Sequence, residues 1–225
     1  CNLFVENKQY DMAMMTDRLG QPFELGDPGI SLKPYPCCRG TDSSLDAMLD
    51  FANTYDIVPQ DVESVEVRIL PLHSTTLIHA NPQTGYEGKF SMQFCMAMAL
   101  IKKKVGVREF VDENVLDPAT QNLIKRVKMI PDPALNEVKE RLKAGASPVI
   151  VTLRLKNGQE YRQQIDYPKG HPDVPLSREE VLGKYRDCAE VVLSQEAMER
   201  SIELIDNLEG IENLQTLAGL LLGGK

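Results

Sequence analysis

Residues 149–165 read VIVTLRLKNGQEYRQQI, and this stretch decides the fold. Apolar and more polar side chains alternate over 149–155, and the alternation resumes over 161–165, which is typical of strands that bury one face. Asn157-Gly158 lies between the two runs. Two strands joined around Asn-Gly predict a β-hairpin with a type I′ turn. Since a hairpin is antiparallel, we expect the chain to contain an antiparallel sheet.

The rest of the chain adds one more strand and several helices. Residues 64–69 alternate in the same way and predict a half-buried strand, and a long loop is expected over 71–88. Spacing and capping signals predict helices over 8–18, 42–55, 91–103, 118–128, 178–192, 195–208 and 211–222, and a helix or an irregular segment over 134–143. The helix over 91–103 is apolar nearly all round and should be deeply buried. Few strands separated by helices predict an α+β fold with a small, mostly antiparallel sheet and packed helices.

The composition of the 225-residue chain argues against several classes of protein. Its formal net charge is −8, whereas nucleic-acid binders usually carry a basic stripe. No apolar run approaches the roughly 20 residues that span a bilayer. The five cysteines form no CxxC pair and the three histidines are scattered, so neither a disulfide framework nor a metal site is predicted. We expect a cytoplasmic protein that binds no nucleic acid, membrane or metal.

The stretch SLKPYPCCRGTD at 31–42 is a candidate anion site, because it precedes a predicted helix. A helix N-terminus offers unpaired backbone N–H groups, and Gly40 lets a ligand approach them closely. Lys33 and Arg39 add two positive charges, and the intervening prolines restrain the backbone. The pattern favours a carboxylate ligand, with Lys33 able to carry a proton. The plainer interpretation is a solvated lysine next to an ordinary helix cap at Thr41-Asp42.

Three segments of the chain resemble one family. They are LKPYPCCRGTDSSLDAMLDFA at 32–52, GKFSMQFCMAMAL at 88–100 and KGHPDVPLSREEVLGKY at 169–185. In this order, and with the same secondary structure between them, they resemble the MmgE/PrpD family. That family includes 2-methylcitrate dehydratase, cis-aconitate decarboxylase and iminodisuccinate epimerase, which need no cofactor. The resemblance covers essentially the whole chain but only about half of the family's length.

The resemblance implies a division of the chain into three parts. Residues 1–27 would end a truncated helical domain, 28–170 would form an α+β domain that covers the substrate, and 171–225 would return as helices to the helical domain. The family's active site lies in a cleft between the two domains. We therefore expect the missing N-terminal helical half, or a companion chain, as a partner, together with homo-oligomers formed through the apolar C-terminal helices.

The resemblance and the helix-start argument together give the site residues. Lys33 is the catalytic candidate by resemblance. The substrate-binding candidates are Arg39, Gly40 and Thr41 at the helix start, and Lys89, Ser91 and Gln93, which the resemblance places in the same cleft. Two positions depart from the family pattern: Asp42 stands where histidine is common, and Phe94 where tyrosine is common. A carboxylate at Asp42 would repel an anionic substrate unless it caps the helix or pairs with Arg39. The plainer roles are an N-cap for Ser91 and a surface position for Lys89.

Two hypotheses follow for the function. The first is the C-terminal portion of a lyase or isomerase that acts on a di- or tricarboxylate, with dehydration like that of 2-methylcitrate dehydratase preferred, and with no activity unless the helical half is supplied. The alternative is a non-catalytic module derived from that family, which binds carboxylates or assembles with a partner.

Overall fold

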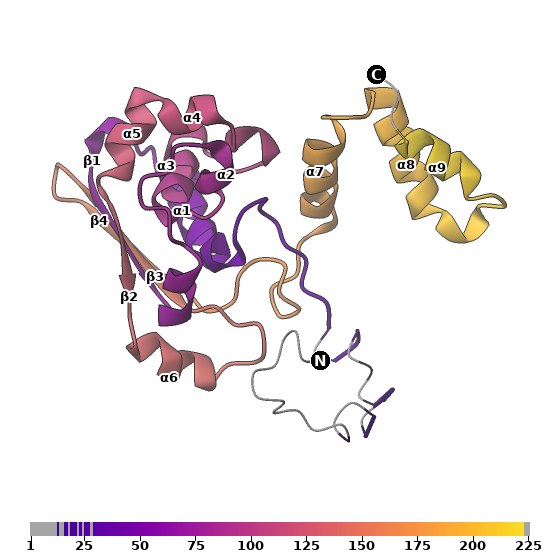
Figure 1. Ribbon diagram of the computed structural model, residues 1–225, viewed down its shortest axis with the longest axis horizontal. Coiled ribbons are helices and arrows are strands. Elements are labelled where there is room, and N and C mark those ends of the chain that lie inside the picture. The colour runs from indigo at the N-terminus through magenta and orange to yellow at the C-terminus, as the bar shows by residue number, and fades with distance from the viewer. Residues whose placement is uncertain are drawn as a thin grey trace.

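The computed structural model describes residues 13, 16–17, 19–21, 23, 25–27 and 29–222. The helix predicted over 8–18 therefore lies largely outside the described residues. The remainder forms a sheet with helices over one face, and a group of C-terminal helices that stands away from the sheet (Figure 1). The α+β prediction is confirmed.

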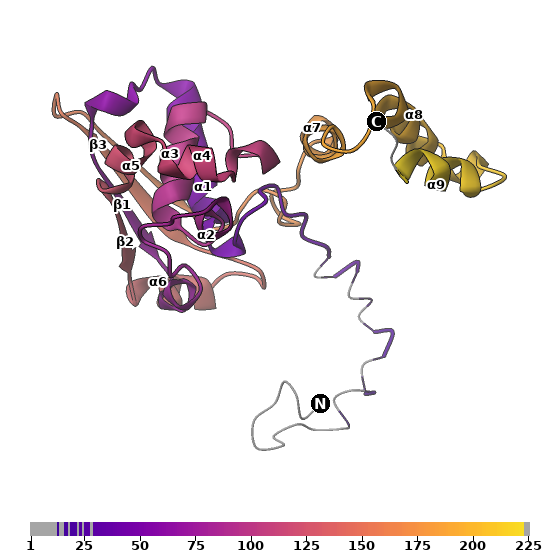
Figure 2. The ribbon, with the colours of Figure 1, turned by 45° about the horizontal axis from the view of Figure 1, so that its top comes forward.

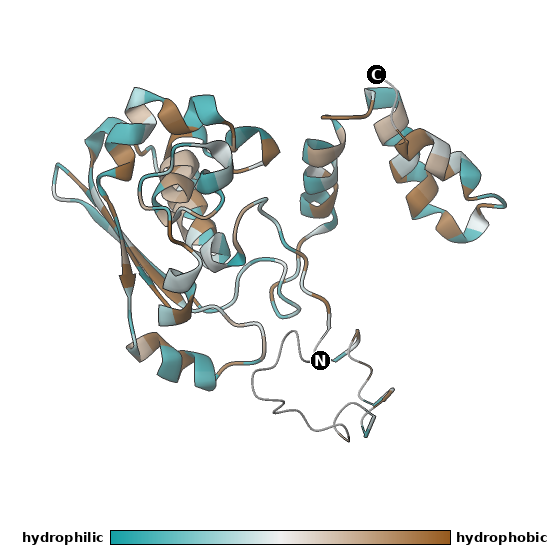
Figure 3. Ribbon diagram, in the orientation of Figure 1, coloured by the Kyte–Doolittle hydropathy of each residue, from teal (hydrophilic) through white to brown (hydrophobic). Residues whose placement is uncertain are grey.

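The sheet is mostly antiparallel, as predicted, with one parallel pair. Its strands are β1 (Val62–Ile69), β2 (Val127–Pro131), β3 (Val149–Leu155) and β4 (Glu160–Ile165), in the order β2-β1-β3-β4. The pairs β1–β3 and β3–β4 are antiparallel, whereas β1 and β2 run parallel. The turn of the hairpin is hydrophilic (Figure 3), and of the two strands that it joins, β3 is largely apolar whereas β4 is mostly polar.

The hairpin is present, but the predicted type I′ turn is wrong. A type I′ turn needs two residues with positive φ, and here Gly158 has a φ of 86° while Asn157 does not have a positive φ. The amide of Gly158 donates to the carbonyl of Leu155 at 2.9 Å, and Leu155 N donates to Gln159 O at 2.9 Å. These bonds define a three-residue loop, which is a type I turn followed by a glycine bulge. The Asn157 side chain accepts from the Gln159 amide at 2.9 Å, which stabilises this alternative.

The helix predicted over 118–128 is too long. It ends at Ile124 as α5 (Pro118–Ile124), and the chain then forms the unpredicted strand β2. The physical reason is the edge of β1. A continued helix would satisfy only its own backbone groups, whereas β2 also pairs with the backbone N–H and C=O groups along that edge. The predicted loop over 71–88 also contains one short helix, α2 (Gly85–Gly88), and a further short helix, α4 (Asp112–Leu116), lies before α5.

The other predicted helices are present with shorter bounds. They are α1 (Asp42–Thr54), α3 (Met92–Lys102), α6 (Ala134–Glu140), α7 (Arg178–Ala189), α8 (Gln195–Asp206) and α9 (Gln215–Leu221). Residues 92–100 of α3 are buried, as predicted. This helix packs against α1, α5 and β2 and forms the centre of the core.

The C-terminal helices form a second, smaller apolar cluster around Ala189, Leu193 and Met198. In both views α7, α8 and α9 lie to one side of the sheet and its helices (Figure 2). Polar contacts join α7 to the larger body: Asp187 accepts from the amide of Val107 at 2.8 Å. Apolar side chains remain exposed on these helices, among them Ile205 on α8 and Leu221 on α9.

Candidate carboxylate site at the start of α1

The segment that carries Lys33 is tied down by a close backbone contact. The amide of Leu32 donates to the carbonyl of Gly170 at 2.9 Å. Gly170 has a φ of 82°, and a Cβ at this position would lie 1.8 Å from the Leu32 carbonyl oxygen. Only glycine fits there, because a side chain would be both strained and in collision. The third family-like segment thus fixes the first, with the Lys33 side chain exposed directly after the contact.

One carboxylate on α1 also holds this segment in place. Asp46 accepts from the Tyr35 hydroxyl at 2.6 Å through Oδ1 and from the amide of Lys169 at 2.7 Å through Oδ2. Burial raises the pKa of Asp46, and these two hydrogen bonds oppose that rise. Burial, together with the neighbouring Asp46, also raises the pKa of Tyr35, so the phenol stays protonated as the donor. Asp46 therefore fixes the lysine-bearing segment against the connector that leads to α7.

The first residue of α1 is a buried carboxyl group surrounded by cations. Asp42 is 2% exposed, and its Oδ1 atom has no hydrogen-bond partner. Burial raises the pKa of Asp42 to about 7, although the positive charges of Lys33, Arg39 and Lys184 lower it. A group with a pKa near neutrality is suited to proton transfer, since both of its protonation states are populated.

Neither of the plainer roles considered for Asp42 is observed. The N-cap residue of α1 is Thr41, and Asp42 makes no capping hydrogen bond. Within the described part of the chain, Arg39 forms no ion pair with Asp42; its Nη2 atom instead donates to the carbonyl of Gly145 at 3.3 Å.

The remaining predicted residues of the first segment are packed against the protein. Thr41 is buried, and its hydroxyl donates to the Cys38 carbonyl at 2.7 Å. The Thr41 hydroxyl also lies 3.1 Å from Cys37 Sγ. The hydrogen bond with Cys37, followed by burial, raises the pKa of the Cys95 thiol, which agrees with packed rather than nucleophilic cysteines. Gly40 is buried as well.

The second family-like segment lies directly beside the first. The carbonyl of Lys89 accepts from the amide of Cys38 at 2.8 Å, so the two segments are joined through the backbone. Ser91 caps α3 by accepting from the amide of Phe94 at 3.1 Å, which is the plainer role considered for it. Gln93 is buried, with its Oε1 atom unpartnered. The roles of Lys89, Ser91 and Gln93 toward a substrate stay predictions.

Two residues near the site were missed by the sequence analysis although both lie in the family-like segments. Lys184 belongs to α7, and its Nζ atom donates to the carbonyl of Pro34 at 3.5 Å, next to Lys33. Asp46 lies one turn after Asp42. The sequence shows only that a carboxylate and a lysine occur within the family-like segments. It does not show that Asp46 is partly buried or that Lys184 lies near Lys33.

Comparison with known proteins shows which family the chain belongs to. Residues 35–210 match the model of the MmgE/PrpD C-terminal domain, and the chain therefore belongs to the MmgE/PrpD family. Among curated proteins it is similar to the cis-aconitate decarboxylase of Mus musculus, with 27% identity over 142 residues, and to that of Homo sapiens, with 27% identity over 146 residues. Each match covers 63% of this chain and 28% of the relative. The chain thus corresponds to a minor part of the length of these relatives.

Proposed function

We propose that this chain is the C-terminal portion of a lyase or isomerase that acts on a di- or tricarboxylate, and that it is inactive until an N-terminal helical half is supplied. The relatives named as cis-aconitate decarboxylases support a tricarboxylate substrate. Dehydration like that of 2-methylcitrate dehydratase remains our preferred reaction. The proposed division is the end of a helical domain at 1–27, a substrate-covering domain at 28–170 and returning helices at 171–225.

One observation carries this proposal: the buried Asp42 carboxyl group, with a pKa of about 7, lies in the field of Lys33, Arg39 and Lys184. Eliminating water or carbon dioxide, or inverting a stereocentre, next to a carboxylate requires a group that exchanges a proton and cations that bind the carboxylate. Asp42 and the exposed Lys33 can exchange protons. The cations offset the negative charge that develops when a proton leaves carbon.

The alternative is a non-catalytic module that binds carboxylates or assembles with a partner. Phe94 favours it, because the hydroxyl of the tyrosine common in the family is absent from this position. The Phe94 ring is fully buried and meets Phe110 edge-on, with centroids 5.6 Å apart. Its surroundings are those of a core residue.

The test is to mix this chain with a helical half from the adjacent coding region and to assay 2-methylcitrate, cis-aconitate and iminodisuccinate. We expect turnover of one of them by the mixture and none by this chain alone. Lys33→Ala should lower kcat/KM by about 100-fold or more. Lys125→Ala, which changes an exposed lysine at the end of α5, is the control and should have no effect. If the mixture turns over none of the three compounds, the enzyme proposal is refuted in these forms and the non-catalytic module is the remaining hypothesis.

The partners and compartment remain proposals too. Apolar side chains exposed on α8 and α9, including Ile205 and Leu221, support binding of the helical half and self-association. Light scattering should detect oligomers, and a monomer at high concentration would contradict this. No helix in the described ranges has both the length and the apolar character needed to cross a bilayer. We keep cytoplasmic localisation, and the absence of cofactor, metal and nucleic acid, as expectations.

A further inference from the structure

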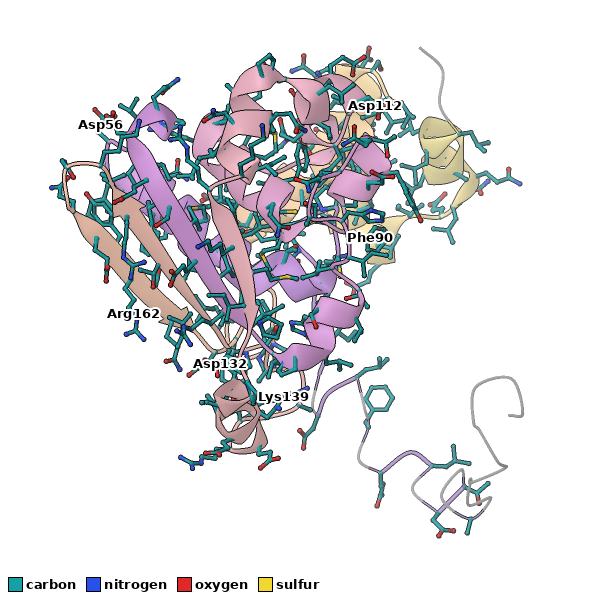
Figure 4. All side chains as sticks on the ribbon, turned by 60° about the vertical axis from the view of Figure 1, so that its left-hand side comes forward. Asp56, Phe90, Asp112, Asp132, Lys139 and Arg162 are labelled. Atoms are coloured by element: carbon teal, nitrogen blue, oxygen red, sulfur yellow. The ribbon has the colours of Figure 1, made fainter. Side chains whose placement is uncertain are left out.

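A polar cleft lies beside the chain segment that carries Arg39. It has a volume of about 450 Å³ and is bounded by the turn before α1, the 3-10 turn Pro71–Thr75, α6 and the loop that leads into β3. The polar residues that line it are Arg39, His73, Thr76, Lys139 and Ser147. Lys139 is labelled at α6, beyond the end of β2 (Figure 4). A cleft of this volume suits a small molecule.

The cleft is electropositive. Arg39 and Lys139 both line it and are exposed, and in the described ranges neither is paired with a carboxylate. Burial lowers the pKa of the His73 imidazole, and the positive charges of Lys139 and Arg39 lower it further. Two unneutralised cations on one concave surface attract an anion.

The cleft also contains polar atoms that lack partners. Ser147 is 4% exposed, and its hydroxyl oxygen makes no hydrogen bond. The Nδ1 atom of His73 is buried and likewise unpartnered. Buried polar atoms are rarely left unsatisfied, because each costs about 1–3 kcal/mol. A bound ligand with acceptor atoms would satisfy the Ser147 hydroxyl and an N–H of the imidazole.

The His73 imidazole can lie close to the start of α1 because Gly40 has no side chain. A Cβ on Gly40 would lie 3.2 Å from Cγ of His73 and 3.3 Å from its Cβ. Glycine thus lets the histidine pack against the backbone that also carries Arg39, which brings the two side chains to one cleft.

We propose that this cleft binds one carboxylate group of a small polycarboxylate, with Arg39 and Lys139 supplying charge and Ser147 and His73 supplying hydrogen bonds. The proposal rests on the proposed function and deepens it: the carboxylate held here is not the one beside Lys33, so the substrate carries at least two carboxylates. Arg39 belongs to both the cleft and the site at the start of α1. It lines the cleft, and its positive charge lowers the pKa of Asp42.

The test uses this chain alone with tricarballylate, a tricarboxylate that does not react. Ring signals of the three histidines are followed by NMR, with His73 assigned through His73→Gln. We expect saturable shifts of His73 and none of His79, whereas His171 lies against Gly145 at the edge of the cleft and is not a reference. Lys139→Ala and Ser147→Ala should each weaken binding by about tenfold, as expected for loss of a hydrogen bond to a charged group. The matched control is Lys143→Ala, whose lysine is exposed and already paired with Asp173 at 2.7 Å.

Three outcomes would overturn the proposal. They are unshifted His73 signals, equal weakening by Lys143→Ala and Lys139→Ala, or equally strong binding of sulfate, which would make the cleft a general anion site. The result is separable from the proposed function. Binding at His73 without turnover by the reconstituted mixture would leave this inference standing and refute the enzyme. Turnover by the mixture with unshifted His73 signals would support the enzyme and refute the binding of a carboxylate in this cleft.

Discussion

Asp42→Asn should make the folded chain more stable at alkaline pH. The usual pKa of this carboxyl group is 3.8, and burial raises it to about 7 in the folded chain. The folded state therefore binds a proton more tightly than the unfolded state does, and stability falls as pH rises from about 4 to 7. Asparagine resembles the protonated acid in shape and carries no charge, so the variant escapes this loss.

The size of the effect follows from the two pKa values. Each tenfold difference in proton affinity between the states corresponds to about 1.4 kcal/mol. The ionised carboxylate therefore costs about 4 kcal/mol above pH 7, of which about 3 kcal/mol develops between pH 5 and pH 8. Little of this is screened by solvent, because Asp42 is only 2% exposed.

The assay is urea-induced unfolding of the wild type, Asp42→Asn and Asp50→Asn at pH 5 and pH 8. Asp50 is an exposed aspartate on the same helix and is the matched control. The free energy of unfolding of Asp42→Asn should exceed that of the wild type by an amount that grows by about 3 kcal/mol between the two pH values. A difference that does not depend on pH would refute the reasoning, as would the same growth in Asp50→Asn.

Two further substitutions test how the Lys33 segment is held. Gly170→Ala places a Cβ against the Leu32 carbonyl at a positive φ, and should lower the free energy of unfolding by more than about 1 kcal/mol and speed hydrogen exchange of the Leu32 amide. Tyr35→Phe removes a donor from the half-buried Asp46 and should cost about 1–3 kcal/mol in urea unfolding. An unchanged free energy of unfolding in Tyr35→Phe would contradict this.

Much of the fold could be predicted because its signals are local. Alternation identified β1, β3 and β4, and caps such as Ser177 with Glu180 identified the start of α7. The strand β2 was missed because it is short, lies at an edge and continues the apolar spacing of α5, so that only its parallel pairing with β1 distinguishes it from helix. The turn type was missed because Asn-Gly is compatible with two loop lengths.

The candidate site could be predicted only in part. Lys33 and Arg39 were found because charge and proline spacing mark them within one segment. The raised pKa of Asp42 could not be found, since it results mainly from burial, which only the folded structure shows. Lys184, whose charge opposes that rise, belongs to a helix far along the chain. The cleft beside Arg39 was missed for the same reason: Arg39, His73, Lys139 and Ser147 come from four separate segments, and the histidine alone resembles a solvated loop residue.

The parallel pair of strands constrains the order in which the chain folds. The strands β3 and β4 are joined by a short loop and can pair within microseconds, whereas β1 reaches β2 only after the chain has passed through α2, α3, α4 and α5. The entropy of closing so long a loop is offset only when α3 is already packed inside it. We therefore expect the hairpin to be the nucleus of the sheet, and β1 to pair with β2 and with β3, which lies still further along the chain, only afterwards.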